Sequence, residues 1–170
     1  MSIESLIQWK VAQGALFPLR PRAAGETCRR AMFLTEGLWN LLHTTHPDDI
    51  MEARVGTLLA DLETFVIGDA ITPKYLFLLA PARDGVWEIR SARPDPSIRV
   101  LGLFADQNVF IATNFALRGE LGGWESREWK EAKRMAVALW RQVCLNYRPI
   151  LSTNVHDLVT GAIDDRYFRE

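Results

Sequence analysis

Three arginines lie within one strand-like stretch of the sequence, residues 86–104, which reads VWEIRSARPDPSIRVLGLF. Arg90 and Arg99 belong to apolar runs, whereas Arg93 belongs to the Pro-rich turn between them. A guanidinium stays charged and can hold a phosphate with two hydrogen bonds, so this stretch could bind an anion. The structural alternative is a cross-strand ion pair of Glu88 with Arg90 or Arg99, worth about 0.2–1 kcal/mol. Composition alone leaves both alternatives open.

Strand register decides which polar side chains share a face with Arg99. If residues 106–107 form a two-residue hairpin loop, counting outward places Arg99 opposite Asn114. The length of the RPDP loop is ambiguous, and a slip of one residue changes whether Arg90 shares that face. Arg118 follows the last strand-like run. We therefore predict an anion site built from Arg99, Asn114 and Arg118, with Arg90 and Arg93 as optional members.

The hydrophobic pattern predicts the elements that position these residues. We expect a small α+β domain over residues 26–148, an N-terminal appendage and linker over 1–25, and a C-terminal tail over 149–170. The predicted elements are a short strand within 28–36, helices over 36–43 and 49–66, strands within 74–80, 86–92, 98–105 and 108–115, and a closing helix from residue 126. Short connections favour antiparallel neighbours. The expected fold is therefore a small antiparallel sheet of three to five strands with two N-terminal helices and a long closing helix.

The composition narrows the class of protein. Its formal net charge of -1 excludes a strong overall field, so any nucleic-acid binding requires a local patch. Cys28 and Cys144 lack the spacing of a zinc site, and we expect two reduced, mostly buried thiols. The three histidines also lack ligand spacing, so no metal or cofactor is predicted. No secretory signal or membrane-length apolar run is evident, which predicts a cytoplasmic protein that does not bind membranes.

Most of the six tryptophans fit core positions. Trp39, Trp129 and Trp140 follow helical stripes, and Trp87 fits a strand face. Trp124 follows two glycines, so it is either an anchor at the start of the closing helix or a platform that stacks a base at the mouth of a cleft. Arg93 and Trp124 are the candidate substrate-binding residues, with a solvent-facing turn as the alternative for Arg93. The charged residues of the closing helix are assigned to its exposed surface: Arg127, Glu128, Lys130, Glu131, Lys133, Arg134 and Arg141.

Four segments carry a resemblance to a known family. They are RVGTLLADLETFVIGD (54–69), VWEIR (86–90), IRVLGLF (98–104) and NVFIATNFALRG (108–119). In this order they resemble the RelE/ParE superfamily of bacterial toxins, and most closely its phage-derived, HigB-like branch. The resemblance implies a RelE-like fold and roles for Arg90, Arg99 and Arg118. One departure is the segment after the last strand, where TNFALRGELGGW replaces a phenylalanine followed by paired lysines.

The resemblance implies cleavage of mRNA in the ribosomal A site, or gyrase poisoning in the ParE branch, and restraint by an antitoxin partner. The leading hypothesis is a ribosome-dependent, metal-free mRNA endoribonuclease of a toxin–antitoxin module. Its catalytic set is Arg99, Arg118, Arg90, Asn114 and Glu88, with Glu88 or His156 as the base. The alternative is a noncatalytic, phage-related interaction or inhibitor protein that binds a protein partner. The near-neutral charge and the missing lysine pair favour this alternative.

Overall fold

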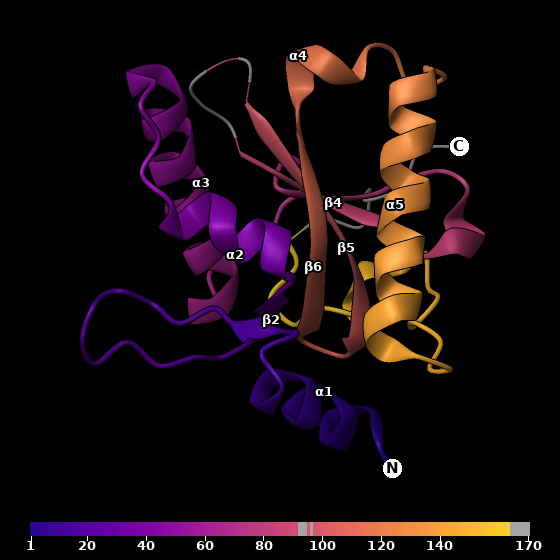
Figure 1. The fold of residues 1–170 in the computed structure, drawn as a ribbon. Helices are drawn as coiled ribbons and strands as arrows, with labels where there is room; N and C mark the ends of the chain where they lie inside the picture. Colours follow the sequence, from indigo (N-terminus) through magenta and orange to yellow (C-terminus); the bar gives the residue numbers. More distant parts are fainter. Residues whose placement is uncertain (92–94, 96, 164–170) are drawn as a thin grey trace.

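The computed structural model describes residues 1–91, 95 and 97–163 of the chain. Within these residues, six strands form one mixed sheet with the order β1-β2-β6-β5-β4-β3. The strands are β1 (Phe17–Pro18), β2 (Ala31–Leu34), β3 (Leu76–Leu78), β4 (Trp87–Arg90), β5 (Ile98–Asp106) and β6 (Val109–Leu117). Figure 1 shows the two long strands, β5 and β6, at the centre of the molecule. The sheet therefore forms a middle layer that the helices can cover.

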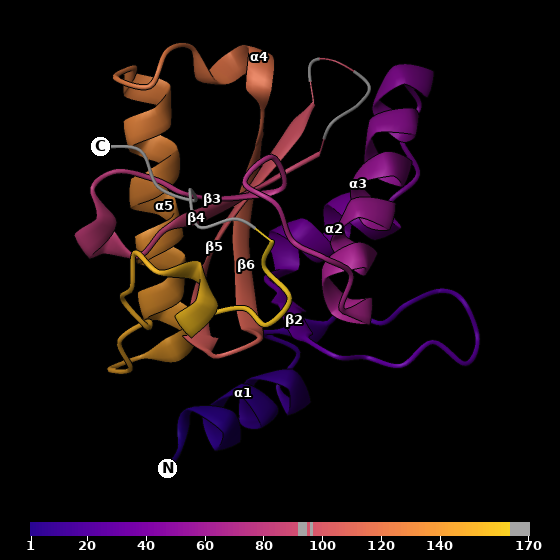
Figure 2. The same cartoon turned by 180° about the vertical axis from the view of Figure 1, so that it is seen from behind.

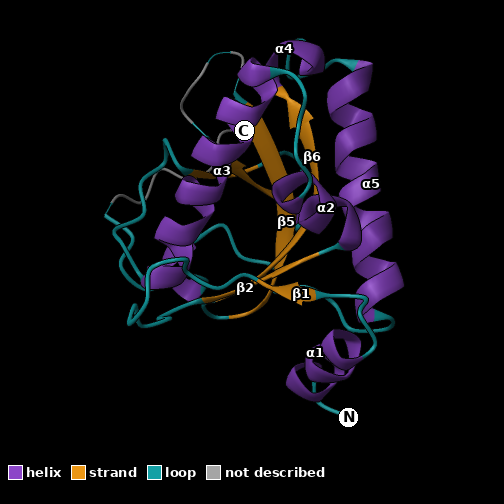
Figure 3. Ribbon diagram, turned by 60° about the vertical axis from the view of Figure 1, so that its left-hand side comes forward, coloured by secondary structure: helices purple, strands orange, loops and turns teal. Residues whose placement is uncertain are grey.

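Helices cover both faces of this sheet. They are α1 (Ile3–Ala12), α2 (Glu36–His43), α3 (Asp49–Ile67), α4 (Arg118–Leu121) and α5 (Arg127–Cys144), with two short 3-10 turns, η1 (Ala82–Asp84) and η2 (Val155–Asp157). Helices α2 and α3 lie on one side of the sheet and α5 lies on the other (Figure 1). Figure 3 shows the long strands between α3 and α5. Among the described residues, no helix is both long and apolar enough to cross a membrane.

The predicted α+β class is confirmed, but the prediction of a small antiparallel sheet of three to five strands is wrong. Strand β1 comes from residues that we assigned to a linker, and it pairs with β2. Strand β2 runs parallel to β6, with Ala31 opposite Val109. The rule that short connections produce antiparallel neighbours does not apply to β2 and β6, because two helices and three strands separate them in sequence.

Local sequence signals set the ends of α3 and α5, which lie within one residue of the predicted helix over 49–66 and of the predicted helix start at 126. The Asp48 side chain accepts a hydrogen bond from the Ile50 N–H at the start of α3, and Gly68 follows its end with a φ of +89°. The Ser126 side chain accepts from the Trp129 N–H at the start of α5. Side-chain caps satisfy backbone donors that have no partner within the helix, and glycine adopts a left-handed φ at low cost.

Side chains alternate between the two faces of the sheet and build two cores. The core beneath α2 and α3 includes Leu34, Leu76, Leu78, Trp87, Ile89, Val100, Phe104, Phe110 and Ala112. The core beneath α5 includes Leu101, Leu103, Ala105, Ile111, Trp129, Trp140 and Val143. Trp87, Trp129 and Trp140 are therefore buried as predicted, and Trp39 packs partly buried against the first core.

Both terminal segments pack onto these cores. Leu6 and Ile7 of α1 are buried in the core beneath α5. Val155 and Leu158 are buried in the core beneath α2 and α3, and the Asn108 N–H donates to the Leu158 carbonyl. Figure 2 shows this C-terminal segment, in yellow, running past the ends of β5 and β6. The segments that we predicted to be an appendage and a tail thus contribute buried side chains to the rest of the chain.

The predicted register of the β5–β6 hairpin is wrong by one loop position. Asp106 pairs with Val109, so the loop is 107–108, and Asn108 there has a φ of +60°. Asparagine tolerates this left-handed conformation better than most residues. Two irregularities, between Leu101 and Gly102 and between Phe104 and Asp106, shift the register by one residue in opposite directions, so their effects cancel at Arg99. The position of the loop alone therefore places Arg99 opposite Ala116 rather than Asn114.

Candidate functional site

Arg90 and Arg99 are direct cross-strand partners on β4 and β5. On β4, Trp87 and Ile89 enter the core beneath α2 and α3, so the alternation of the strand turns Glu88 and Arg90 towards the α5 side. Residues paired across two antiparallel strands project to the same face. The structure therefore brings the two arginines together and answers the question that the ambiguous RPDP loop left open.

Glu88 lies beneath this pair as a fully buried carboxylate. Its Oε1 accepts a hydrogen bond from Arg90 Nε at 2.6 Å, which forms an ion pair. Its Oε2 has no hydrogen-bond partner among the described residues. The pair that we predicted as the structural alternative is thus present, within β4 rather than across strands. Because Glu88 is fully buried, it holds Arg90 in place and is shielded from any ligand above it.

Arg99 is half-buried and lies in a crowded cationic environment. Burial lowers the pKa of Arg99. The Glu88 carboxylate opposes this effect, Arg90 and Arg118 lower the pKa further, and the Asp95 carboxylate raises it again. Arg99 Nε is buried and has no hydrogen-bond partner among the described residues. A buried donor without an acceptor is costly, and a bound anion would remove that cost. Arg99 therefore has the features of an anion-binding residue.

Arg118 and Asn114 come from the same end of β6. In the register of the structure, Arg99 pairs with Ala116 and Asn114 pairs with Leu101, so Arg99 and Asn114 share a face but are not opposite each other. The Arg118 side chain donates to the Gly122 carbonyl at 2.9 Å. Asn114 Nδ2 donates to the Ala132 carbonyl of α5 at 3.1 Å, so this amide fastens α5 to the sheet.

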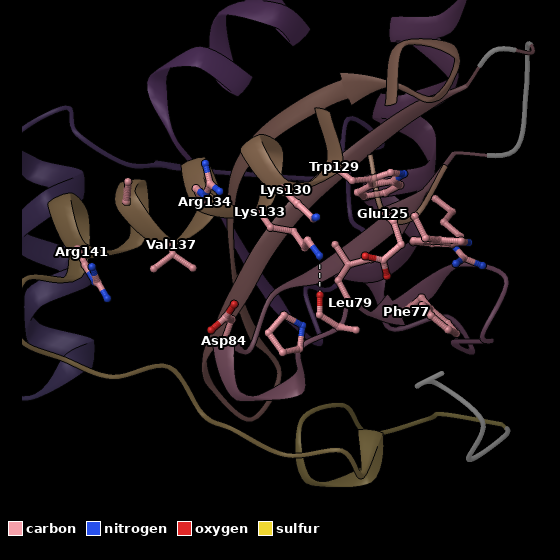
Figure 4. Close-up of a pocket in the computed structure, with 15 residues that line it drawn as sticks. Phe77, Leu79, Asp84, Glu125, Trp129, Lys130, Lys133, Arg134, Val137 and Arg141 are labelled. Atoms are coloured by element: carbon pink, nitrogen blue, oxygen red, sulfur yellow. Dashed lines mark hydrogen bonds between the residues drawn. The ribbon is translucent and has the colours of Figure 1, made fainter. Parts of the chain in front are cut away.

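The four charged residues Glu88, Arg90, Arg99 and Arg118 thus form one group, called the arginine cluster below. Arg90 links this cluster to a cleft of about 1180 Å³ between α5 and the segment from β3 to η1. Figure 4 shows the cleft, with side chains of α5 facing Phe77, Leu79 and Asp84. Arg93, the other candidate from the same stretch, lies outside the described residues.

Trp124 lies in this cleft and is 47% exposed. Its ring stacks on Trp129 with a centroid distance of 4.9 Å and an interplanar angle of 20°. The ring centre of Phe77 lies 6.4 Å from that of Trp124, and the Arg90 guanidinium carbon is 4.4 Å from the Phe77 ring centre. Trp124 thus packs against the first turn of α5, as an anchor of that helix would, and is also exposed to the cleft, so base stacking stays a prediction.

Sequence reasoning missed the row of cations that α5 presents to the cleft. The row consists of Lys130, Lys133, Arg134 and Arg141. Their spacing of three, one and seven residues places them on one side of a helix, and this was the signal in the sequence. Together with Arg90 they outnumber the two acids that line the cleft, Asp84 and Glu125. The surface that we assigned to solvent is therefore one wall of a basic cleft.

The three histidines lie away from the arginine cluster. His43 stacks on Trp39 of α2, and the His46 ring contacts the Leu41 carbonyl. The His156 carbonyl accepts from Gln107 at the β5–β6 loop, which is the opposite end of the sheet from the cluster. Within the described part of the chain, no group of three His, Cys, Asp or Glu residues is placed to hold a metal ion.

Comparison of this chain with protein families, with curated proteins and with solved structures gives no match in any of the three. The interpretation of the site therefore depends on its geometry and chemistry.

Proposed function

We propose that this protein acts on RNA as a toxin-type endoribonuclease, of the kind that its sequence resembles. The observation that supports this most is the arginine cluster, in which Arg90 and Arg118 lie near Arg99. Two carboxylates, Glu88 and Asp95, also act on Arg99. Two acids do not neutralise three guanidinium groups, so the cluster keeps an excess of positive charge next to an open cleft. A phosphodiester supplies the complementary charge and fits the planar fork of arginine.

In this proposal the 2′-hydroxyl of a ribose attacks the adjacent phosphorus while the bond to the 5′-oxygen breaks. The 2′-oxygen passes its proton to a water molecule and the leaving 5′-oxygen takes one from water, which gives a cyclic phosphate and a 5′-hydroxyl. Negative charge builds on the phosphorane oxygens, and preorganised cations stabilise this charge. We assign that role to Arg99 and Arg118. Glu88 is a positioning residue that fixes Arg90 through their 2.6 Å contact.

The proposed substrate is mRNA on the ribosome, and the proposed partner is an antitoxin that restrains the protein in the cytoplasm. The test is to express the wild type and the Arg99→Ala/Arg118→Ala variant and to measure growth and translation. We expect the wild type to arrest growth and the variant to lose most of this effect, because the cations that stabilise the phosphorane are gone. Circular dichroism must show that both proteins fold. Absence of arrest by the folded wild type would contradict the proposal.

A second candidate is a noncatalytic protein that binds a partner protein on the same fold. It is favoured by the placement of Asn114 and Glu88, two of the five predicted catalytic residues, whose polar groups are engaged inside the protein. For this candidate, purified wild type would leave RNA intact while binding a defined partner through the arginine cluster. The Arg99→Ala/Arg118→Ala variant would then lose the partner and not an activity.

A further inference from the structure

Trp124 is unusual among the tryptophans because it combines a stacked ring with large exposure. It is 47% exposed, whereas Trp129 beneath it is 1% exposed. The backbone before it reverses at Gly122, which has a φ of +64°, so the chain presents the ring at the cleft just before α5 begins. A large aromatic ring that is exposed in a cleft leaves apolar surface in contact with water, and a flat ligand that stacks on the ring would cover this surface.

The chemistry around this ring suits a nucleobase. Phe77 provides a second aromatic surface, and the Arg90 guanidinium carbon lies 4.4 Å from Phe77 and 6.0 Å from Trp124. Stacking on aromatic rings together with a nearby arginine is how proteins hold single-stranded nucleic acid.

The cations of α5 continue from this aromatic end of the cleft. Figure 4 shows Lys130 and Lys133 extending from α5 into the cleft, with Arg141 at its other end. Lys133 Nζ is fixed by a 2.6 Å hydrogen bond to the Ala80 carbonyl. With a rise of 1.5 Å per helical residue, the row from Lys130 to Arg141 spans about 16 Å, which is longer than one nucleotide. The row therefore suits a phosphate backbone.

We propose that Trp124, Phe77 and Arg90 form a stacking site for one unpaired base of a single-stranded RNA, and that Lys130, Lys133 and Arg134 bind its neighbouring phosphates. This inference rests on the proposed function, because it assigns the RNA a path from the arginine cluster into the cleft. It adds a contact to the base itself, which the arginine cluster does not supply.

The test measures binding of purified protein to a short oligoadenylate and to an abasic ribose-phosphate oligomer of equal length. Trp124→Ala should weaken oligoadenylate binding between about fivefold and about 150-fold, the range for loss of one base–aromatic stack. Binding of the abasic oligomer should not change. Trp124→Phe should keep part of the affinity, and unchanged thermal midpoints will show that both variants fold. Trp9→Ala is the matched control, since Trp9 is also 47% exposed but does not line the cleft.

The phosphate contacts are tested by salt dependence. Lys130→Gln/Lys133→Gln should weaken both oligomers and reduce the slope of log affinity against log salt by about 1.4, from two lost contacts to a single strand. Arg127→Gln is the control, because Arg127 is paired with Glu131 and does not line the cleft. Equal effects of Trp124→Ala and Trp9→Ala on oligoadenylate would overturn the stacking site. If RNA binding then still required Arg99 and Arg118, the proposed function would stand. If wild type bound neither oligomer and caused no growth arrest, both proposals would fall.

Discussion

The two faces of strand β5 differ in the way they are stabilised. Towards α2 and α3, Phe104 is fully buried among the rings of Phe65, Trp87 and Phe110. Towards α5, Arg99 is half-buried near two other cations and two carboxylates, and its Nε has no partner among the described residues. The first face gains stability from packing, whereas the second holds charged groups with an excess of positive charge. A charged group in such surroundings is a candidate functional residue.

The largest effect is expected on the apolar face. Phe104→Ala should lower the free energy of unfolding by about 3–5 kcal/mol, because it removes a buried ring and leaves a cavity. Chemical denaturation of wild type and variant will measure this loss. Ile50→Ala on α3 is the control, since Ile50 is 57% exposed and its loss should cost no more than about 0.5 kcal/mol. A loss below about 1 kcal/mol for Phe104→Ala would show that this face is not the main core.

A much smaller effect is expected on the α5 face. Arg99→Met should change the free energy of unfolding by no more than about 1 kcal/mol, because the relief of repulsion by Arg90 and Arg118 and the lost attraction to Glu88 and Asp95 oppose each other. The measurement is again chemical denaturation, and Arg99→Lys is the control that keeps the charge. If Arg99→Met instead destabilises the protein as strongly as Phe104→Ala, then Arg99 is a structural partner of Glu88 and the contrast between the faces is lost.

The sequence predicts what local signals determine. Asp48, Gly68 and Ser126 act within one turn of the helix ends that they set, and the structure confirms these positions. The two-residue strand β1 was missed because, among the described residues, β2 is the one strand that pairs with it, and pairing of this kind depends on the whole fold. The β5–β6 register was missed because the loop was placed one residue too early, with Asp106 in it instead of Asn108.

The candidate site could be predicted only in part, because residue types and helical spacing are local signals whereas contacts between elements depend on the whole fold. The residue types of Arg90 and Arg99 identified a cationic stretch, but the loop that separates them did not reveal that they pair across the strands. On α5, helical spacing showed that Lys130, Lys133 and Arg134 lie on one side of the helix. It could not show that this side faces β3 and η1 rather than solvent. Sequence periodicity shows which residues share one face of a helix or strand. Only the tertiary structure shows which other elements that face contacts.

The reactivity of the two cysteines tests whether solvent reaches the α5 side of the sheet only at the cleft or also at the end of α5. Cys144 at the end of α5 is fully buried, and burial raises its pKa to about 12 from an ordinary value of 9.0. Its reactive thiolate is therefore about a thousandfold scarcer than that of an ordinary thiol. Cys28 is exposed, contrary to the expectation of two mostly buried thiols. At mildly alkaline pH, alkylation followed by mass spectrometry should modify Cys28 quickly and Cys144 only slowly.

The Cys28→Ser variant isolates the slow reaction. In this variant Cys144 should react only when denaturant unfolds the protein, because a protonated and buried thiol is a poor nucleophile. The folded state binds the proton of Cys144 more tightly than the unfolded state, so the contribution of Cys144 to stability should also fall as the pH rises above 9.0. Rapid labelling of native Cys28→Ser would mean that the end of α5 opens. Helix α5 would then be loosely packed along the cleft. Slow labelling would instead show that α5 is firmly packed and that the cleft is a local opening beside it.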